Sequence, residues 1–217
     1  MGRVRVHQHV NPLAPYFRFT PSPIEIEKIF ANPEMPILLD IGCARGRFLL
    51  QMADLDKSQN YIGIEIREAL VNEGNRLAQE ANLTNLHYEF SNAMVNLDKS
   101  IANFPKGLLQ TVTIQFPDPW FKKKHAKRRM VNRQLVETVV EHLAENGRIF
   151  VQTDIEFLAE EMFELFRENE NLCEIEVNEN PFPVKTEREK AVEDKDLPVY
   201  RRIFEYQKSK GQRSKVK

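Results

Sequence analysis

The chain has 217 residues, of which 41% are hydrophobic and 29% are charged, and its formal net charge is −1. This composition excludes an intrinsically disordered protein, and the length favours one globular domain with a full core. No apolar run approaches the roughly 20 residues that cross a bilayer, and the first residues lack the apolar centre of a signal peptide. We therefore expect a cytoplasmic protein. Cys43 and Cys173 have no Cys or His neighbour at ligand spacing, so we expect no disulfide and no metal.

From residue 37 onward, the hydrophobic pattern alternates between the periods of a strand and of a helix. The expected strands cover residues 37–41, 60–66, 86–90, 107–116, 147–153, 173–177 and 199–207, and the expected helices cover 47–54, 67–81, 132–143 and 155–167. This alternation predicts an α/β fold with a mostly parallel sheet of about seven strands and helices on both faces. Ligands of such sheets bind beyond the carboxyl ends of the strands.

The chain ends differ in composition from this central part. Residues 1–23 contain four prolines and no sustained period, which indicates a partly flexible N-terminal arm. The arm could join a nucleic-acid surface through Arg3, Arg5, Tyr16, Phe17 and Arg18, although a simple tail is the safer interpretation. Residues 24–207 form the expected domain, and residues 208–217 form a basic tail.

An acidic residue closes each of the first two expected strands. Asp40 precedes a turn with Gly42 and Gly46, where the missing side chains let the backbone contact a ligand, first at Gly42. Asp40 suits the charge of an amine or a sulfonium, and Glu65 is placed to hold both hydroxyls of a ribose. The alternatives are a helix cap at Asp40 and a surface acid at Glu65.

The turn after the first strand departs from a dinucleotide fingerprint. That fingerprint requires glycine where Ala44 and Arg47 stand, which argues against a nicotinamide dehydrogenase. Asn92 follows the third strand and carries an amide that suits the edge of adenine. An acid, a glycine turn, an acid and an amide at successive strand ends predict a pocket for S-adenosylmethionine.

The stretch after the fourth strand combines an acid, an aromatic ring and many cations. Asp118 lies between two prolines, which hold it on a stiff loop, and Trp120 follows. Seven cations come next, namely Lys122, Lys123, Lys124, Lys127, Arg128, Arg129 and Arg133. Residues 134–196 hold eighteen acids against six Lys or Arg, so the small net charge conceals a basic segment that suits phosphates. The alternative for the cations is a solvated helix start.

From about residue 37 to residue 206, the chain resembles bacterial tRNA (guanine-N7-)-methyltransferases, most of all those of cyanobacteria. The most specific motif runs from Pro117 to Arg129. The resemblance implies a class I Rossmann-like methyltransferase fold. It implies S-adenosyl-L-methionine as donor, S-adenosyl-L-homocysteine as product, and N7 of a guanine in the tRNA variable loop as acceptor. Because N7 carries a free lone pair, no general base is needed.

The resemblance also implies roles for individual residues. The cofactor set is Asp40, Glu65, Asn92 and Asp118, and Asp118 is also the catalytic position. The substrate contacts are Lys122, Asp154, Thr186, Glu187, Arg188 and Glu189. The tRNA phosphate contacts are Lys123, Lys124, Lys127, Arg128 and Arg129.

The sequence departs from the family pattern in places. Ala44 stands where glycine is frequent, and Asn92 stands where an acid is frequent, so we expect altered cofactor affinity. Lys124 replaces a common arginine and keeps the charge without the bidentate grip. A class I methyltransferase for another RNA or a small molecule, and a non-catalytic RNA-binding protein with this fold, remain alternatives. A monomer and a homodimer are both open, and Trp120 could stack on a base or anchor its loop.

Overall fold

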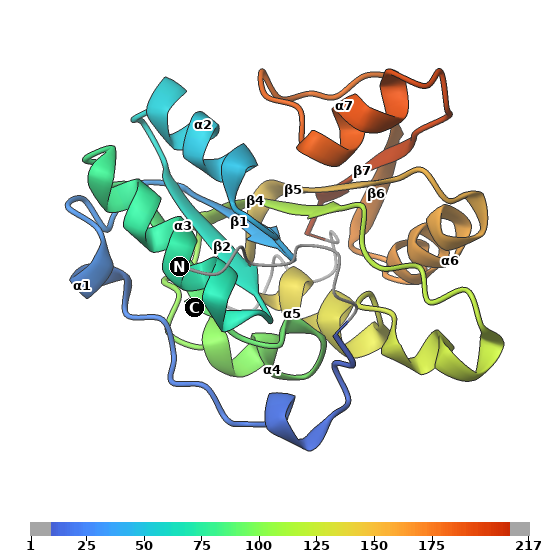
Figure 1. Cartoon of the computed structure of the whole chain (residues 1–217), viewed down its shortest axis with the longest axis horizontal. Helices are drawn as coiled ribbons and strands as arrows, with labels where there is room; N and C mark the ends of the chain where they lie inside the picture. Colours follow the sequence, from blue (N-terminus) through green and yellow to red (C-terminus); the bar gives the residue numbers. More distant parts are fainter. Residues whose placement is uncertain (1–9, 209–217) are drawn as a thin grey trace.

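The structure, a computed structural model, describes residues 10–208 around one central sheet (Figure 1). The strands are β1 (Ile37–Ile41), β2 (Asn60–Glu65), β3 (Leu86–Phe90), β4 (Leu109–Gln115), β5 (Leu143–Thr153), β6 (Leu172–Glu176) and β7 (Tyr200–Tyr206). Their order is β3-β2-β1-β4-β5-β7-β6. Strands β1 to β5 pair in parallel, and β7 is antiparallel to both β5 and β6. The expected mostly parallel α/β sheet of seven strands is confirmed.

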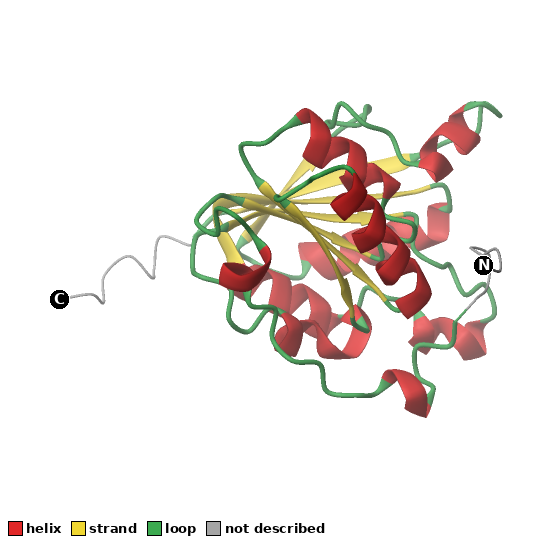
Figure 2. Ribbon diagram, turned by 60° about the vertical axis from the view of Figure 1, so that its left-hand side comes forward, coloured by secondary structure: helices red, strands yellow, loops and turns green. Residues whose placement is uncertain are grey.

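Helices cover both faces of this sheet (Figure 2). They are α1 (Ile26–Ile29), α2 (Arg47–Leu55), α3 (Glu68–Glu80), α4 (Ala93–Ser100), α5 (Arg133–His142), α6 (Glu156–Arg167) and α7 (Glu187–Glu193). Short 3-10 helices span Pro15–Phe17 and Lys123–Arg128. Within residues 10–208, no helix combines the length and the apolar character needed to cross a membrane.

Alternate side chains of β1 enter two different cores, because successive residues of a strand point to opposite faces. Leu39 and Ile41 pack with residues of α4, α5 and α6. Leu38 packs with residues of α2 and α3, and with Val184 from the segment before α7. Asp40 is on the same side of β1 as Leu38, so its carboxyl group faces the side of the sheet covered by α2 and α7.

The boundary between α5 and β5 differs from the expectation. We expect a helix over 132–143 and a strand from 147, but α5 ends at His142 and β5 begins at Leu143 without a loop. Leu143 pairs with Leu109 of β4, and Arg148 is the next partner, opposite Thr111. The intervening residues bulge out of the ladder, with Asn146 at φ 61°. A bulge is a local irregularity that apolar periodicity does not reveal.

The described part of the N-terminal arm packs where β3 meets α4. The side-chain amide of Asn96 donates to the carbonyl of Phe19 over 2.7 Å. The ring of Phe19 stacks on Phe90 with their centroids 4.9 Å apart. Arg3, Arg5 and residues 209–217 of the predicted tail lie outside the described residues.

Candidate active site

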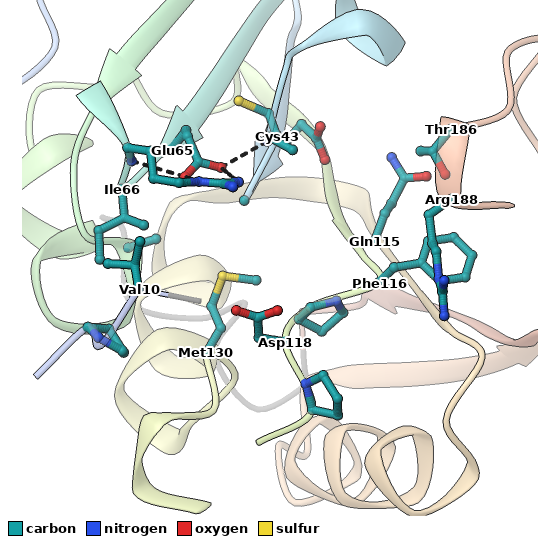
Figure 3. Close-up of a pocket in the computed structure, with 18 of the residues that line it drawn as sticks. Val10, Cys43, Glu65, Ile66, Gln115, Phe116, Asp118, Met130, Thr186 and Arg188 are labelled. Carbon is teal, nitrogen blue, oxygen red and sulfur yellow. Dashed lines mark hydrogen bonds and ion pairs between the residues drawn. The ribbon is translucent and has the colours of Figure 1, made fainter. Parts of the chain in front are cut away.

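A cavity of about 1650 Å³ opens at the carboxyl ends of β1, β2, β4 and β5 (Figure 3). It is larger than typical small-molecule pockets, so it has room for a cofactor and a base together. The predicted residues that line it are Asp40, Gly42, Glu65, Asn92, Asp118, Arg128, Asp154, Thr186, Glu187 and Arg188. The structure thus brings the strand-end residues to one cavity, whereas the lysines from 122 to 127 lie outside it.

The turn after β1 has a left-handed backbone at Gly42 (φ 82°), Ala44 (φ 51°) and Gly46 (φ 68°). A side chain at Gly46 would place its Cβ 2.2 Å from the ring of Tyr88, so only glycine fits there. Ala44 carries a methyl group in a conformation that favours glycine. Its backbone N–H donates to Oε2 of Glu65 over 2.9 Å, which ties the turn to the end of β2.

Asp40 is an almost fully buried carboxyl group, with 4% of its surface exposed. Burial raises the pKa of Asp40 to about 6, because the charged form loses its hydration. The hydroxyl of Thr113 opposes this rise by donating to Oδ1 over 2.6 Å. The neighbouring Gln115 amide also favours the charged form of Asp40, although it lies outside hydrogen-bonding geometry.

Glu65 is buried at the end of β2, and Arg67 holds its carboxylate. The Nε of Arg67 lies 2.8 Å from Oε1 of Glu65, and Nη2 lies 3.1 Å from Oε2. Figure 3 shows Glu65 on one wall of the cavity, close to Ile66. A ribose at Glu65 would therefore compete with the guanidinium of Arg67, a residue that was not predicted to belong to the site.

The side-chain amide of Asn92 is used within the protein. It donates to the carbonyls of Pro12 (2.8 Å) and Phe17 (3.1 Å), both in the N-terminal arm. Val10 and Pro12 themselves line the cavity. The group that we expect at the adenine edge therefore holds the arm against the end of the cavity.

The loop after β4 has a strained backbone and is held in place by Arg129. Phe116 (φ 51°) and Trp120 (φ 44°) have left-handed backbones on either side of the two prolines that flank the exposed Asp118. The guanidinium of Arg129 donates to the carbonyls of Pro119 (3.0 Å) and Trp120 (3.4 Å), and it forms an ion pair with Glu161. These contacts hold the backbone that directly follows Asp118, which lines the cavity.

The basic segment divides into two groups. Its lysines are exposed and face solvent, namely Lys122, Lys123, Lys124 and Lys127. The arginines have partners inside the protein. Arg128 lies over the ring of Trp120, 4.9 Å from its centroid. Arg129 donates to the carbonyls of Pro119 and Trp120. Arg133 pairs with Glu168 over 2.7 Å. Among contacts within residues 10–208, therefore, only the lysines of this segment can meet an incoming phosphate without first giving up such a partner.

The segment predicted to face the substrate begins α7. Thr186 caps the helix by accepting from the N–H of Glu189 over 3.1 Å. Glu187 pairs with Arg47 of α2 over 2.5 Å, and Arg188 pairs with Asp154 at the end of β5. Glu189 points inward, is fully buried, and does not line the cavity. Three of these residues therefore border the cavity, and the fourth supports them from behind.

Several cavity residues were missed from the sequence, among them Arg67, Gln115 and Met130. One signal was available for Gln115. Thr111, Thr113 and Gln115 alternate with the apolar residues Val112 and Ile114, which indicates a polar row on one face of the sheet. Met130 carries no such signal, because a methionine after a basic run is also expected in an ordinary core.

Comparison with known proteins agrees with this geometry. The family described as "Putative methyltransferase" matches residues 34–202. A tRNA (guanine-N(7)-)-methyltransferase of Nostoc sp. is 48% identical over 206 residues, covering 93% of this chain and 94% of the relative. The chain belongs to the tRNA (guanine-N7-)-methyltransferase family. A relative of the same name from Synechococcus elongatus is 48% identical over 94% of this chain and 97% of its own length.

A solved structure supports the fold of this methyltransferase family member. A 30S ribosomal methyltransferase from an uncultured bacterium aligns with a TM-score of 0.55 and 17% identity. The alignment covers 85% of this chain and 95% of the other. The expected class I Rossmann-like architecture is confirmed.

Proposed function

We propose that this methyltransferase transfers a methyl group from S-adenosyl-L-methionine to N7 of a guanine in the variable loop of tRNA. The observation that carries the proposal is the meeting of Asp40, Glu65 and Asp118 in one cavity beside a surface of exposed lysines. Family membership supports the same reaction. A tRNA substrate implies a cytoplasmic enzyme.

The residues around the cavity fit this cofactor by the chemistry of their polar groups. S-adenosyl-L-methionine supplies a methyl group on a cationic sulfur. Asp40 and Glu65 are acids with 4% and 3% exposure, and they suit a ligand that carries an ammonium group and ribose hydroxyls. The backbone of Gly42 borders the cavity without a side chain. Glu65 takes the ribose once Arg67 moves aside.

The chain's own residues contribute alignment and electrostatics. Guanine N7 attacks with a lone pair that is already free, so no side chain has to remove a proton. Fixing the base against the methyl group can lower the barrier by roughly 7–11 kcal/mol. Asp118 on its anchored loop accepts from the base N1–H and stabilises the positive charge that moves onto the purine. Asp154 accepts from the same edge after Arg188 releases it.

The exposed lysines position the RNA in this proposal. Lys122, Lys123, Lys124 and Lys127 contact phosphates, which fix orientation without reading sequence. Arg128 and Arg129 contribute through the loop that carries Trp120 and Asp118. The target guanine is unstacked when it enters the cavity.

A methyl-transfer assay tests the proposal directly. The protein is incubated with labelled S-adenosylmethionine and an unmodified tRNA transcript, and the RNA is then cleaved chemically at 7-methylguanosine. Cleavage at one variable-loop guanine supports the proposal. Label in a ribosomal RNA fragment but not in tRNA would favour another RNA substrate. Binding of tRNA without any cofactor binding would favour the non-catalytic alternative.

A further inference from the structure

A row of polar side chains, buried except for the last one at the cavity, crosses the sheet from β7 to β4. Arg201, Gln152 and Gln115 occupy matching positions on β7, β5 and β4. Arg201 Nε donates to Oε1 of Gln152 over 3.1 Å, and Gln152 Nε2 donates to Oε1 of Gln115 over 2.8 Å. Glu189 joins from α7 through Arg201 Nη2 (2.9 Å) and Gln152 Nε2 (3.2 Å).

This row fixes which end of each amide faces which neighbour. Arginine has donors only, so the atom of Gln152 that faces Arg201 must be its oxygen. The Gln152 nitrogen then faces Glu189 and Gln115. Because that nitrogen also has donors only, Gln115 must turn its oxygen toward it. The amino group of Gln115 consequently points away from the row. Turning either amide over would oppose two donors.

The amino group of Gln115 is buried and has no hydrogen-bond partner within residues 10–208. Gln115 lines the cavity. Figure 3 shows it on the wall between Cys43 and the pair Thr186 and Arg188. The Asp40 carboxylate lies near this amino group without reaching hydrogen-bonding geometry. A buried donor that makes no complete hydrogen bond costs free energy, and a ligand acceptor at this wall of the cavity would complete it.

The charge next to Gln115 restricts what that acceptor can be. Asp40 is its neighbour, and a carboxylate there repels the anionic end of an amino-acid ligand. An ammonium group suits Asp40, but it has no lone pair for the Gln115 donor. A neutral carbonyl oxygen fits both neighbours. Guanine carries such an oxygen, O6, beside N7 on the same edge, whereas adenine carries an amino group in that place.

We propose that the Gln115 amide donates a hydrogen bond to O6 of the target guanine and thereby selects guanine over adenine. The inference rests on the proposed methyl transfer to guanine N7. Both purines offer an N7 lone pair, so the reacting atom alone cannot distinguish them. Adenine would place its amino group, a second donor, against the amino group of Gln115, so no hydrogen bond could form. Gln152 and Arg201 act as positioning residues, because they hold the amide in the one orientation that permits this discrimination.

The test is a double-mutant cycle between the protein and the RNA. The protein change is Gln115→Met, which keeps the length of the side chain and removes the donor. The RNA change replaces the target guanosine with 2-aminopurine riboside, which lacks O6 and keeps N7. Single-turnover methyl transfer is measured for all four pairs, since the cycle cancels the effect of the base change on N7 itself.

On the RNA with guanosine, Gln115→Met should lower kcat/KM about tenfold, the upper range for one neutral hydrogen bond. Replacing the guanosine should likewise cost the wild-type protein about tenfold more than it costs Gln115→Met. Gln115→Met should lose nothing further on the RNA that lacks O6. Equal losses by Gln115→Met on both RNAs would overturn the inference. A weaker affinity for S-adenosylmethionine in Gln115→Met would also overturn it, because the amide would then hold the cofactor.

Two controls separate folding and function from this inference. Gln110→Met, on the same strand but outside the cavity lining, should behave as wild type. Gln115→Glu keeps the acceptor for Gln152, and it carries the same cycle if Gln115→Met unfolds. If wild type leaves the tRNA guanine unmethylated, the proposed function fails. If wild type methylates it but the cycle shows no coupling, only the role of Gln115 fails.

Discussion

The carboxylate of Glu65 is clasped by Arg67, only two residues along the chain, through Nε–Oε1 (2.8 Å) and Nη2–Oε2 (3.1 Å) contacts. The N–H of Arg67 adds a third donor to Oε1 over 3.0 Å. The pair lines the cavity, so the acid that we assign to the ribose already has a cationic partner. In the proposed cofactor complex, ribose hydroxyls would replace the Arg67 donors at Glu65.

Glu65→Ala should weaken S-adenosylmethionine binding by at least ~1.5–3 kcal/mol, the range for a hydrogen bond to a charged group. The physical reason is the loss of the acceptor for both ribose hydroxyls. Isothermal calorimetry measures the change. Glu68→Ala, at the exposed start of α3, is the matched control and should leave the affinity intact. Unchanged binding in a folded Glu65→Ala protein would remove this residue from the cofactor site.

Asp118→Asn should lower kcat by at least ~100-fold, the low end for removing one well-placed electrostatic partner in a transition state. The substitution keeps the size of the side chain and removes its charge. Binding of tRNA should persist, because the exposed lysines remain. Single-turnover rates and filter binding measure the two effects, and thermal melting checks the fold. A near-normal rate would leave Asp118 as a turn former between its prolines.

Replacing Lys122, Lys123 and Lys127 with alanine should weaken tRNA binding and leave cofactor affinity unchanged. Each lost phosphate contact should flatten the slope of log affinity against log salt by roughly 0.7–0.9. A matched triple variant at other exposed lysines, Lys99, Lys106 and Lys195, should keep the wild-type slope. Equal slopes in both triple variants would mean that the basic segment is only a solvated surface.

Cofactor affinity should depend on pH through Asp40, whose pKa is about 6. Below that pH the carboxyl group is neutral and loses its attraction for an ammonium group. Affinity should therefore rise from about pH 5 to about pH 7. The cofactor affinity of Asp40→Asn should equal that of wild type near pH 5 and should be lower than that of wild type near pH 7. A parallel pH profile in the two proteins would argue against this assignment.

The carboxyl group of Asp40 also makes the stability of the folded protein depend on pH. Its pKa is about 6 in the folded protein, above the ordinary value of 3.8. The folded state therefore binds more protons between these values, and the contribution of Asp40 to stability falls as pH rises through them. Above that window Asp40→Asn should melt at a higher temperature than wild type, and the difference should vanish in acid.

Arg129→Ala should lower kcat while leaving tRNA affinity near the wild-type value. The reason is its three contacts, with the carbonyls of Pro119 and Trp120 and with Glu161, which anchor the loop that carries Asp118. Arg129→Lys should not restore the rate, because one ammonium group cannot reproduce a planar fork of donors. A salt slope reduced as in the lysine variant, with normal kcat, would identify Arg129 as a phosphate contact instead.

The strands were predictable because β1 is a nearly continuous apolar run, as in a strand buried on both faces, and strands such as β4 carry apolar residues at alternate positions. The helix α4 was not. Its buried side includes Asn96 and Ser100, which bond to the arm and to Ser91, so its inward face is partly polar. The partner of Asn96, Phe19, lies 77 residues earlier in the chain, so no local sequence pattern could predict this contact.

The strand-end acids were predictable for a similar physical reason, since a parallel sheet brings successive carboxyl ends to one edge. Their detailed partners were not. The sequence places Arg129 within a basic run, but Glu161, 32 residues later, draws it into the loop. The orientation of Gln115 depends on Arg201 through Gln152, and such a relay exists only after the strands have paired. The assigned roles of these residues remain predictions.

The position of β7 between β5 and β6 has a consequence for synthesis. It is the last of the seven strands to leave the ribosome, although its place is inside the sheet. Until it emerges, one edge of β5 offers unpaired N–H and C=O groups to other chains. Glu189 also lacks its Arg201 partner. The wall of the cavity near Gln115 can therefore form only after residues 200–206 clear the exit tunnel, and a nascent chain stalled before them should aggregate instead of binding its ligands.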